Sequence, residues 1–396
     1  MNRQVKFDYL LLIVVLLLIV IGIAMIYSAS SFKAEEHFGD SNYFLKKQLI
    51  RVLLGLILMV IFFNVDYHNL QKLSWLIFLG TLLLLVYVLI GGIKINGSRR
   101  SIYLVSFVFQ PSEAAKYALI LFLSSFLAQK GKRIREFTNG LLPALLVISI
   151  TVILILLEPD LGTAIILFSI ACIMLFASEV NLLHLSALGL SSLAVISIAL
   201  ANFSYQRRRL LSFIDTIRGI KEPSWQIMQS LISFSNGGFW GVGLGNSKQK
   251  LHFLPQPFTD FIYSIISEET GFVGAFIVML LFLVFLWRGT WIALNAPDQS
   301  GKLLAIGITA SISIYAFASV AIAINLVPIT GISLPFISYG GSSLLMNSIG
   351  VGILLNISRQ IKNKPVSIYS KTNTVTSQQR FRSNKVKRRK RVTRKI

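Results

Sequence analysis

Long apolar runs recur along most of this chain, with short polar segments between them. A helix needs about 20 mostly apolar residues to cross a hydrocarbon core of roughly 30 Å, and somewhat shorter runs are tolerated where the bilayer or flanking side chains adjust. The sequence therefore predicts an all-α polytopic membrane protein with ten transmembrane helices. The ten runs are residues 9–28, 48–64, 73–90, 113–127, 141–157, 161–177, 182–201, 270–287, 303–324 and 343–357.

The orientation follows from Lys and Arg in the short loops, which are retained on the cytoplasmic side. With the N-terminus inside, the cytoplasm receives the C-terminal tail and the cluster Lys130, Lys132, Arg133 and Arg135. An even number of spans then places both termini in the cytoplasm. The first run is read as a retained span, because it is longer than the apolar part of a secretory signal.

The longest connection, residues 202–269, lies between the seventh and eighth predicted spans and is extracytoplasmic on this topology. A connection of this length is commonly functional, so we expect it to be a catalytic loop within a membrane domain of residues 1–357. Residues 358–396 mix Ser, Thr, Gln and Asn with Lys and Arg and contain few large apolar side chains. They are predicted to form a disordered basic cytoplasmic tail.

Composition agrees with this interpretation and corrects a first impression of the charge. The chain is 54% hydrophobic and 14% charged, which excludes an ordinary soluble enzyme. Its net charge of +22 suggests nucleic-acid binding, but 14 of the 38 Lys and Arg lie in residues 359–396. Beside a membrane, such a tail is expected to attract anionic lipid rather than nucleic acid. The single cysteine, Cys172, excludes an intramolecular disulfide.

Two charged motifs lie at the ends of predicted spans. Glu113 and Lys116 are three residues apart and share a helical face, which suits either a local ion pair at a helix start or contact with a ligand. Glu158 and Asp160 form a short acidic turn between the fifth and sixth spans. That turn is either a simple tight connection or a pair of carboxylates beside a cavity.

Asp260 lies among aromatic residues at a predicted membrane edge, where a charge is costly and commonly functional. An equal alternative is that Thr259 or Asp260 caps the helix that runs to Glu269. A helix N-terminus lowers the pKa of a carboxyl, whereas apolar surroundings raise it. The sequence leaves the direction open.

Two further segments are rich in glycine. The run 237–246 is typical of a tight turn in which glycines let backbones approach closely, and it lacks the βαβ context of a dinucleotide site. In residues 326–343, Pro and Gly interrupt an apolar stretch, which predicts a re-entrant segment that is buried or lines a wet cavity. The chain has no GxxxxGK[ST] or HExxH motif, so the usual residues for ATP hydrolysis and zinc chemistry are absent.

Taken together, these segments resemble the SEDS family, the FtsW, RodA and SpoVE proteins of bacterial division, elongation and sporulation. The resemblance covers essentially all of residues 1–357, and segment 245–250 is closer to the FtsW branch than to RodA. The segments that carry it are 109–113, 158–163, 209–215, 241–250, 254–255, 259–262, 268–271 and 328–343.

The resemblance implies a peptidoglycan glycosyltransferase that polymerises lipid II outside the bacterial cytoplasmic membrane during septal wall synthesis. It also implies a class B penicillin-binding protein and other divisome proteins as partners. Asp260 matches the family's essential aspartate and is assigned as the general base. The positions expected to bind substrate are Glu113, Lys116, Asp160, Lys248, Gln249, Lys250, Ser338 and Ser342.

One general base suffices for this reaction because pyrophosphate is already a good leaving group, whereas glycosidases need two carboxyls. The leaving charge is assigned to Lys116, Lys248, Lys250 or a divalent cation. No cofactor is otherwise expected, and a metal site is unknown. The family usually has Glu-x-His before Thr-Asp, where this chain has Gln256-Pro257-Phe258, and Arg-Trp-Ile where it has Arg100-Ser101-Ile102.

Three alternatives to a division polymerase stay open at this point. A lipid II flippase would also use ten spans with charged residues facing a cavity. A RodA-like elongation polymerase would share the chemistry. A non-catalytic division scaffold would only recruit the transpeptidase.

Overall fold

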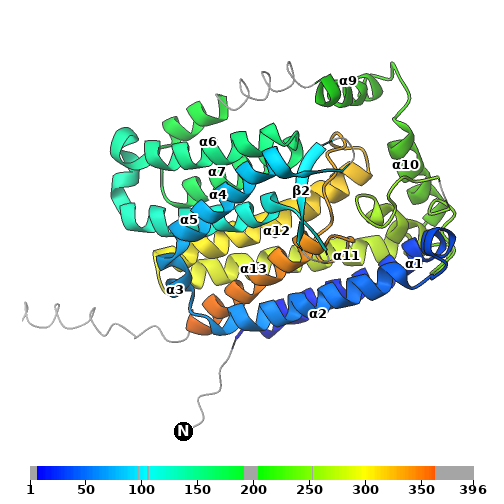
Figure 1. Ribbon diagram of the computed structural model, residues 1–396, viewed down its shortest axis with the longest axis horizontal. Helices are drawn as coiled ribbons and strands as arrows, with labels where there is room; N and C mark the ends of the chain where they lie inside the picture. Colours follow the sequence, from blue (N-terminus) through cyan, green and yellow to red (C-terminus); the bar gives the residue numbers. More distant parts are fainter. Residues whose placement is uncertain (1–6, 96–97, 105–106, 191–203, 252, 362–396) are drawn as a thin grey trace, which may run out of the picture. The chain divides into compact units, whose positions relative to one another are not determined.

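The computed structural model describes residues 7–95, 98–104, 107–190, 204–251 and 253–361. Residues up to Ile361 form one compact unit, so the predicted tail boundary at residue 358 is a few residues too early, and residues 362–396 lie outside the described residues. Most described residues are helical (Figure 1). The α-helices are α1 (Tyr9–Phe38), α2 (Tyr43–Asn64), α3 (Tyr67–Lys72), α4 (Ser74–Gly91), α5 (Pro111–Lys130), α6 (Leu142–Leu157), α7 (Leu161–Ala177), α9 (Ser204–Ile217), α10 (Trp225–Gly237), α11 (Ile262–Asn295), α12 (Gln299–Ala323) and α13 (Gly341–Gln360).

Nine of the ten predicted runs coincide with α1, α2, α4, α5, α6, α7, α11, α12 and α13. For the seventh run, residues 182–190 are helical and the remainder lies outside the described residues. Six described segments are long and apolar enough to cross a membrane by length and composition, and α7 is a shorter apolar helix. The count of ten spans therefore stays a prediction.

The expectation of an all-α chain is wrong in one place, between α4 and α5. There β1 (Ile93–Ile95), β2 (Ser98–Leu104) and β3 (Phe107–Phe109) form a small antiparallel sheet in the order β1-β2-β3. Ile95 pairs with Ser98 of β2, and Leu104 pairs with Phe107 of β3. A span pattern does not detect such a sheet, because its strands lie in a connection between helices.

The helices divide into an inner and an outer set. In α12 and α13, 78% of the residues in the most apolar window are buried, against 28% in α4 and α11. Helix α13 packs against α2, α5 and α12. Helix α11 packs against α1, α10 and α12. The exposed faces of the outer helices are apolar, including Leu83 and Ile90 of α4 and Phe272 and Phe276 of α11. Such faces are suited to lipid.

The segment predicted as an extracytoplasmic loop, 202–269, contains structure of its own. It holds α9 and α10 and the first residues of α11. The predicted eighth span is longer than expected, because α11 begins at Ile262 and continues across a break at Gly271, whose φ is 68°. The helix predicted to run to Glu269 is therefore the first part of α11.

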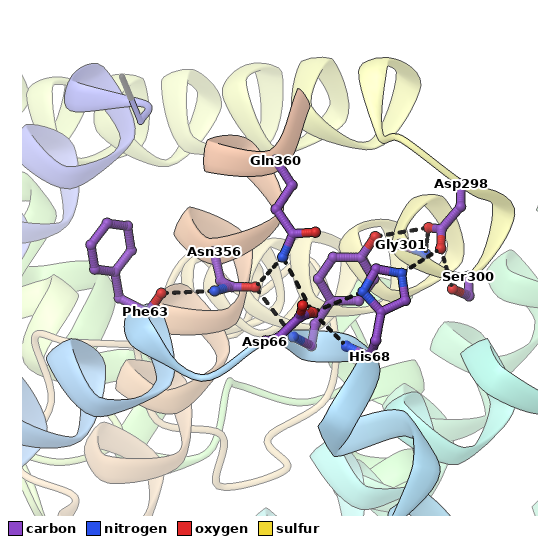
Figure 2. Close-up of polar contacts among 9 residues, drawn as sticks. Phe63, Asp66, His68, Asp298, Ser300, Gly301, Asn356 and Gln360 are labelled. Atoms are coloured by element: carbon purple, nitrogen blue, oxygen red, sulfur yellow. Dashed lines mark hydrogen bonds and ion pairs between the residues drawn. The ribbon is translucent and has the colours of Figure 1, made fainter. Parts of the chain in front are cut away.

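A polar network connects α3, the start of α12 and the end of α13 (Figure 2). The His68 imidazole lies between two carboxylates, with Nδ1 2.8 Å from Asp66 Oδ1 and Nε2 2.9 Å from Asp298 Oδ2. Asn356 donates to the Phe63 carbonyl oxygen at 2.8 Å. Because Asp298 precedes α12 and Asn356 belongs to the last turns of α13, the network fixes the end of the bundle opposite Gly341.

Candidate functional site

Asp260 lies in the last turn before α11, and the α12–α13 connection holds that turn in place. Tyr339 N–H donates to the Phe258 carbonyl oxygen at 2.9 Å, and Ser338 Oγ donates to the Thr259 carbonyl oxygen at 2.6 Å. Ser338 Oγ also accepts from Leu334 N–H at 2.8 Å. Ser338, a predicted substrate-binding residue, thus supports the backbone next to Asp260.

The alternative that Thr259 or Asp260 caps the helix is wrong. The residue preceding α11 is Phe261, and no side chain caps that end of the helix. Asp260 is partly buried. Burial raises the pKa of Asp260, while the guanidinium groups of Arg100 and Arg209 act in the opposite direction. Burial is the larger effect, so its carboxyl takes up a proton more readily than an exposed aspartate does.

The small sheet brings Arg100 to Asp160. Arg100 Nη1 lies 3.9 Å from Asp160 Oδ2, and Gln110 Nε2 donates to the same oxygen at 3.4 Å. Asp160 also caps α7, because its Oδ1 accepts from Thr163 N–H at 3.1 Å. Burial raises the pKa of Asp160 despite the nearby Arg100. Ser342 fixes the neighbouring chain, since its Oγ accepts from Gln110 N–H at 2.9 Å.

The segment Ile329–Gly331 links these groups. Arg209 Nη1 of α9 donates to the Ile329 carbonyl oxygen at 3.0 Å. A Cβ built on Gly331 would lie 3.5 Å from Asp260 Oδ2, and one built on Gly162 of α7 would lie 2.7 Å from Thr330 Cβ. Residues from α7, α9 and the turn before α11 therefore converge on one short stretch of backbone.

Glu113 and Lys116 form an ion pair of 2.8 Å in the first turns of α5. Both side chains are buried, and the Lys116 ammonium lies 3.9 Å from the centre of the Tyr315 ring of α12. The predicted local ion pair is present. The Glu113 charge is also among the groups that act on Asp160, so the pair belongs to the same polar region.

Glu158, the other carboxylate of the acidic turn, is fully buried, and neither of its oxygens has a hydrogen-bond partner among the described residues. Burial, together with the nearby Asp160, raises the pKa of Glu158 to about 8. Such a group is protonated at neutral pH, because an unpaired buried charge is costly.

The glycine run forms the close backbone approach that its sequence predicts. Gly241 N–H donates to the Gly237 carbonyl oxygen at 2.7 Å, and Val242 N–H donates to that of Glu268 at 3.0 Å. A Cβ on Gly241 would lie 2.3 Å from the Glu269 carbonyl oxygen. Only glycine allows the run to lie directly on the first turns of α11.

The predicted substrate-binding residues 248–250 are held by α11. Lys250 Nζ contacts Glu269 Oε1 at 2.9 Å and donates to Ser28 Oγ of α1 at 3.2 Å. The backbone N–H groups of Lys248 and Gln249 both donate to the Glu268 carboxylate at 3.3 Å. Gln249 is buried, whereas the Lys248 side chain is exposed. Lys250 is thus part of an internal ion pair, and its role in substrate binding stays a prediction.

Sequence reasoning did not assign a role to Arg100 or Arg209. Arg209 lies in segment 209–215, which carries the family resemblance, and Arg100 lies where this chain differs from the usual Arg-Trp-Ile. Both belong to parts of the chain that are expected on the extracytoplasmic side. The missing information was spatial, because Arg100, Asp160, Arg209 and Asp260 lie on four different elements. Among the described residues, no three His, Cys, Asp or Glu side chains lie close enough together to hold a metal ion.

Comparisons with known proteins agree on one family. The model of the FtsW/RodA/SpoVE family, described as a cell cycle protein, matches residues 8–363. Stage V sporulation protein E of Bacillus subtilis is 42% identical over 90% of this chain and 98% of its own length. A probable peptidoglycan glycosyltransferase FtsW of Geobacter sulfurreducens is 39% identical over 91% of this chain and 97% of its own length.

Solved structures agree with the sequence comparisons. A chain from a study of how a peptidoglycan synthase complex coordinates polymerisation and crosslinking is 28% identical, with a TM-score of 0.74 over 90% of this chain and 98% of its own. The rod shape determining protein RodA of Thermus thermophilus is 28% identical, with a TM-score of 0.67 over 91% and 99% of the two chains.

Proposed function

The chain belongs to the FtsW/RodA/SpoVE family, and we propose from this premise that it polymerises lipid II with Asp260 as the general base. The family and the named relatives make it a multi-pass bacterial inner-membrane protein and a peptidoglycan glycosyltransferase. The observation that carries the catalytic assignment is the position of Asp260, a partly buried carboxylate in a turn fixed by Ser338 and Tyr339.

In the proposed step, the Asp260 carboxylate takes the proton from a sugar hydroxyl of the acceptor. The hydroxyl oxygen then forms a bond to the anomeric carbon of the donor, and the bond from that carbon to pyrophosphate breaks. The pyrophosphate leaves with the electron pair, and the configuration at the anomeric carbon inverts. One positioned base typically contributes roughly 10²–10⁴-fold to such a reaction.

We place this activity in septal wall synthesis, with both termini in the cytoplasm and the loop of residues 202–269 on the opposite side. The similarity to proteins named FtsW supports a role in division. A class B penicillin-binding protein is the proposed partner, since a similar chain comes from a complex that polymerises and crosslinks. The basic segment from Lys362 onward is proposed to bind anionic lipid.

The test is polymerisation of labelled lipid II by purified full-length protein reconstituted in vesicles. Asp260→Asn and Asp260→Ala are expected to lower the rate by about 10²-fold or more, because the base is lost. Asp215→Asn is the matched control, since Asp215 lies in the same connection and its carboxylate pairs with the exposed Lys221 at 2.8 Å.

Glycan chains made at the normal rate by Asp260→Ala would refute the assignment. A flippase would instead move lipid II between leaflets and make no polymer in the wild type. A non-catalytic scaffold would neither move lipid II nor make polymer. Transport and polymerisation are measured in the same vesicles.

A further inference from the structure

The leaving pyrophosphate requires positive charge close to Asp260, and two of the three lysines assigned to that role are held in ion pairs inside the protein. Lys116 is buried in its ion pair with Glu113 and against Tyr315. Lys250 is buried in its ion pair with Glu269. Two arginines, Arg100 and Arg209, also act on the charge of Asp260.

We propose that Arg100 and Arg209 bind the pyrophosphate of the lipid-linked donor. This inference rests on the proposed function and deepens it, because it names the residues that recognise the leaving group. The two side chains reach the site from different elements, β2 and α9, and so would hold the diphosphate between them.

The contacts of the two arginines place both in the polar region that includes Asp260 and Asp160. Arg209 donates to the Ile329 carbonyl oxygen, two residues from Gly331, whose built Cβ lies 3.5 Å from Asp260 Oδ2. Arg100 lies 3.9 Å from Asp160, which begins α7 where Gly162 packs on Thr330. The charges of both guanidiniums act on Asp260.

The environment of Arg100 leaves it able to bind an anion. Its side chain is 29% exposed, whereas that of Asp160 is 6% exposed. At 3.9 Å the pair is long for a charge-assisted hydrogen bond, which is commonly about 2.7–2.9 Å. Asp160 therefore orients Arg100 without occupying all of its five N–H donors.

Arginine suits this task better than lysine. Its planar guanidinium offers paired N–H donors that match two phosphate oxygens, and it stays charged at all relevant pH values. When the bond between the anomeric carbon and pyrophosphate breaks, the leaving oxygen gains negative charge. Preorganised donors at that oxygen stabilise the transition state more than the ground state.

The two arginines also affect the ionisation of the proposed base, Asp260. A nearby cation favours the charged form of a carboxyl, and burial opposes it. Arg100 and Arg209 therefore keep Asp260 closer to its ionised form than burial alone would allow. The two guanidinium groups would favour the ionised form of Asp260 before the reaction and stabilise the negative charge of the pyrophosphate as it leaves.

The experiment uses the full-length protein in detergent with farnesyl diphosphate and farnesyl monophosphate as inhibitors of lipid II polymerisation. Arg100→Ala and Arg209→Ala are each expected to raise the inhibition constant for the diphosphate about tenfold or more, as for loss of a charge-assisted contact. The constant for the monophosphate should change less. Arg100→Lys and Arg209→Lys should give intermediate values, because they keep the charge and lose the paired donors.

The matched controls are Arg99→Ala and Arg208→Ala. Both residues adjoin the proposed pair in sequence and have exposed side chains, so their inhibition constants should equal that of the wild type. If an alanine variant fails to fold, the lysine variant at that position decides the question.

A second measurement separates binding from a merely structural role. Removing Arg100 is expected to move the acidic limb of the pH–rate profile to higher pH, because the pKa of Asp260 loses an opposing cation. Unchanged diphosphate inhibition in all four variants would overturn the proposal. If those variants behave normally while Asp260→Ala is inactive, the pyrophosphate assignment fails and the proposed function stands.

Discussion

At the residue scale, the Glu113–Lys116 pair is both structural and part of the polar region around Asp160. Its side chains are 7% and 1% exposed. Breaking a buried ion pair by removing one partner typically costs about 3–5 kcal/mol, whereas removing both charges is often nearly neutral. Stability and activity can therefore be separated by comparing single and double variants.

We expect Lys116→Met alone to destabilise the protein by about 3–5 kcal/mol, because Glu113 is left buried without its partner. Combining it with Glu113→Gln should restore most of the thermal stability in detergent, since both charges are gone. We also expect the double variant to remain deficient in lipid II polymerisation, as the resemblance assigns both residues to substrate. Recovery of both stability and polymerisation would show that the pair is purely structural.

Residue roles were predictable where they depend on local sequence and not where they depend on distant elements. The spacing of Glu113 and Lys116 predicts their ion pair, because both lie on one helix. The sequence could not exclude that Asp260 caps a helix, and the structure does, because α11 begins after Phe261 and no side chain caps it. The position of Arg100 near the site could not be predicted from the sequence, because its partner Asp160 is 60 residues away in the chain.

At the scale of elements, the glycine run and the two parts of α11 form one unit. Gly271 has a φ of 68°, and a Cβ there would lie 2.4 Å from Gly241 N and from the Phe239 carbonyl oxygen. The clash is with backbone, so no side-chain rotation relieves it. This contact also explains why the helix is interrupted at Gly271.

We expect Gly271→Ala to displace the run 238–243 and to lower both thermal stability and polymerisation. Backbone with φ 68° and ψ −168° costs a non-glycine residue about 1–3 kcal/mol, and the overlap adds about 1–3 kcal/mol. Gly219→Ala is the matched control, because its φ is 69° and nothing lies within 4 Å of its built Cβ. Equal losses in the two variants would mean that backbone strain alone explains the effect.

The elements that sequence predicts best are those with a long repeating signal. Nine apolar runs became helices, because about 20 apolar residues leave few other solutions in lipid. The sheet between α4 and α5 was missed, although Asn96-Gly97 is a pair favoured in hairpin turns. The α11 break was missed because a single glycine does not interrupt a hydropathy pattern.

At the scale of the whole molecule, titratable groups lie at both ends of the helices. Near the proposed site, burial raises the pKa of Glu158 from 4.5 to about 8. At the other end (Figure 2), burial opposes the charge of His68, but its hydrogen bonds to Asp66 and Asp298 outweigh burial and raise its pKa above 6.5. Both groups bind a proton more tightly in the folded state than in the unfolded state.

A raised pKa in the folded state stabilises the protein fully below the unfolded pKa, and that stabilisation is lost as the pH rises through the folded pKa. For Glu158 the loss falls between 4.5 and about 8, and for His68 it begins near 6.5. Thermal stability should therefore decline from about pH 5 to about pH 8. Polymerisation should rise over the lower part of this range, because Asp260 acts only when ionised.

Glu158→Gln tests this argument, because the amide imitates the protonated carboxyl at every pH. We expect the variant to keep its stability at low pH and to lose less of it as the pH rises to about 8, with the His68 part of the decline unchanged. Midpoint temperatures are compared at one heating rate, since membrane proteins commonly unfold irreversibly. The same slope in wild type and variant would mean that Glu158 is ionised in the folded protein, and that the acidic turn binds a partner for its charge.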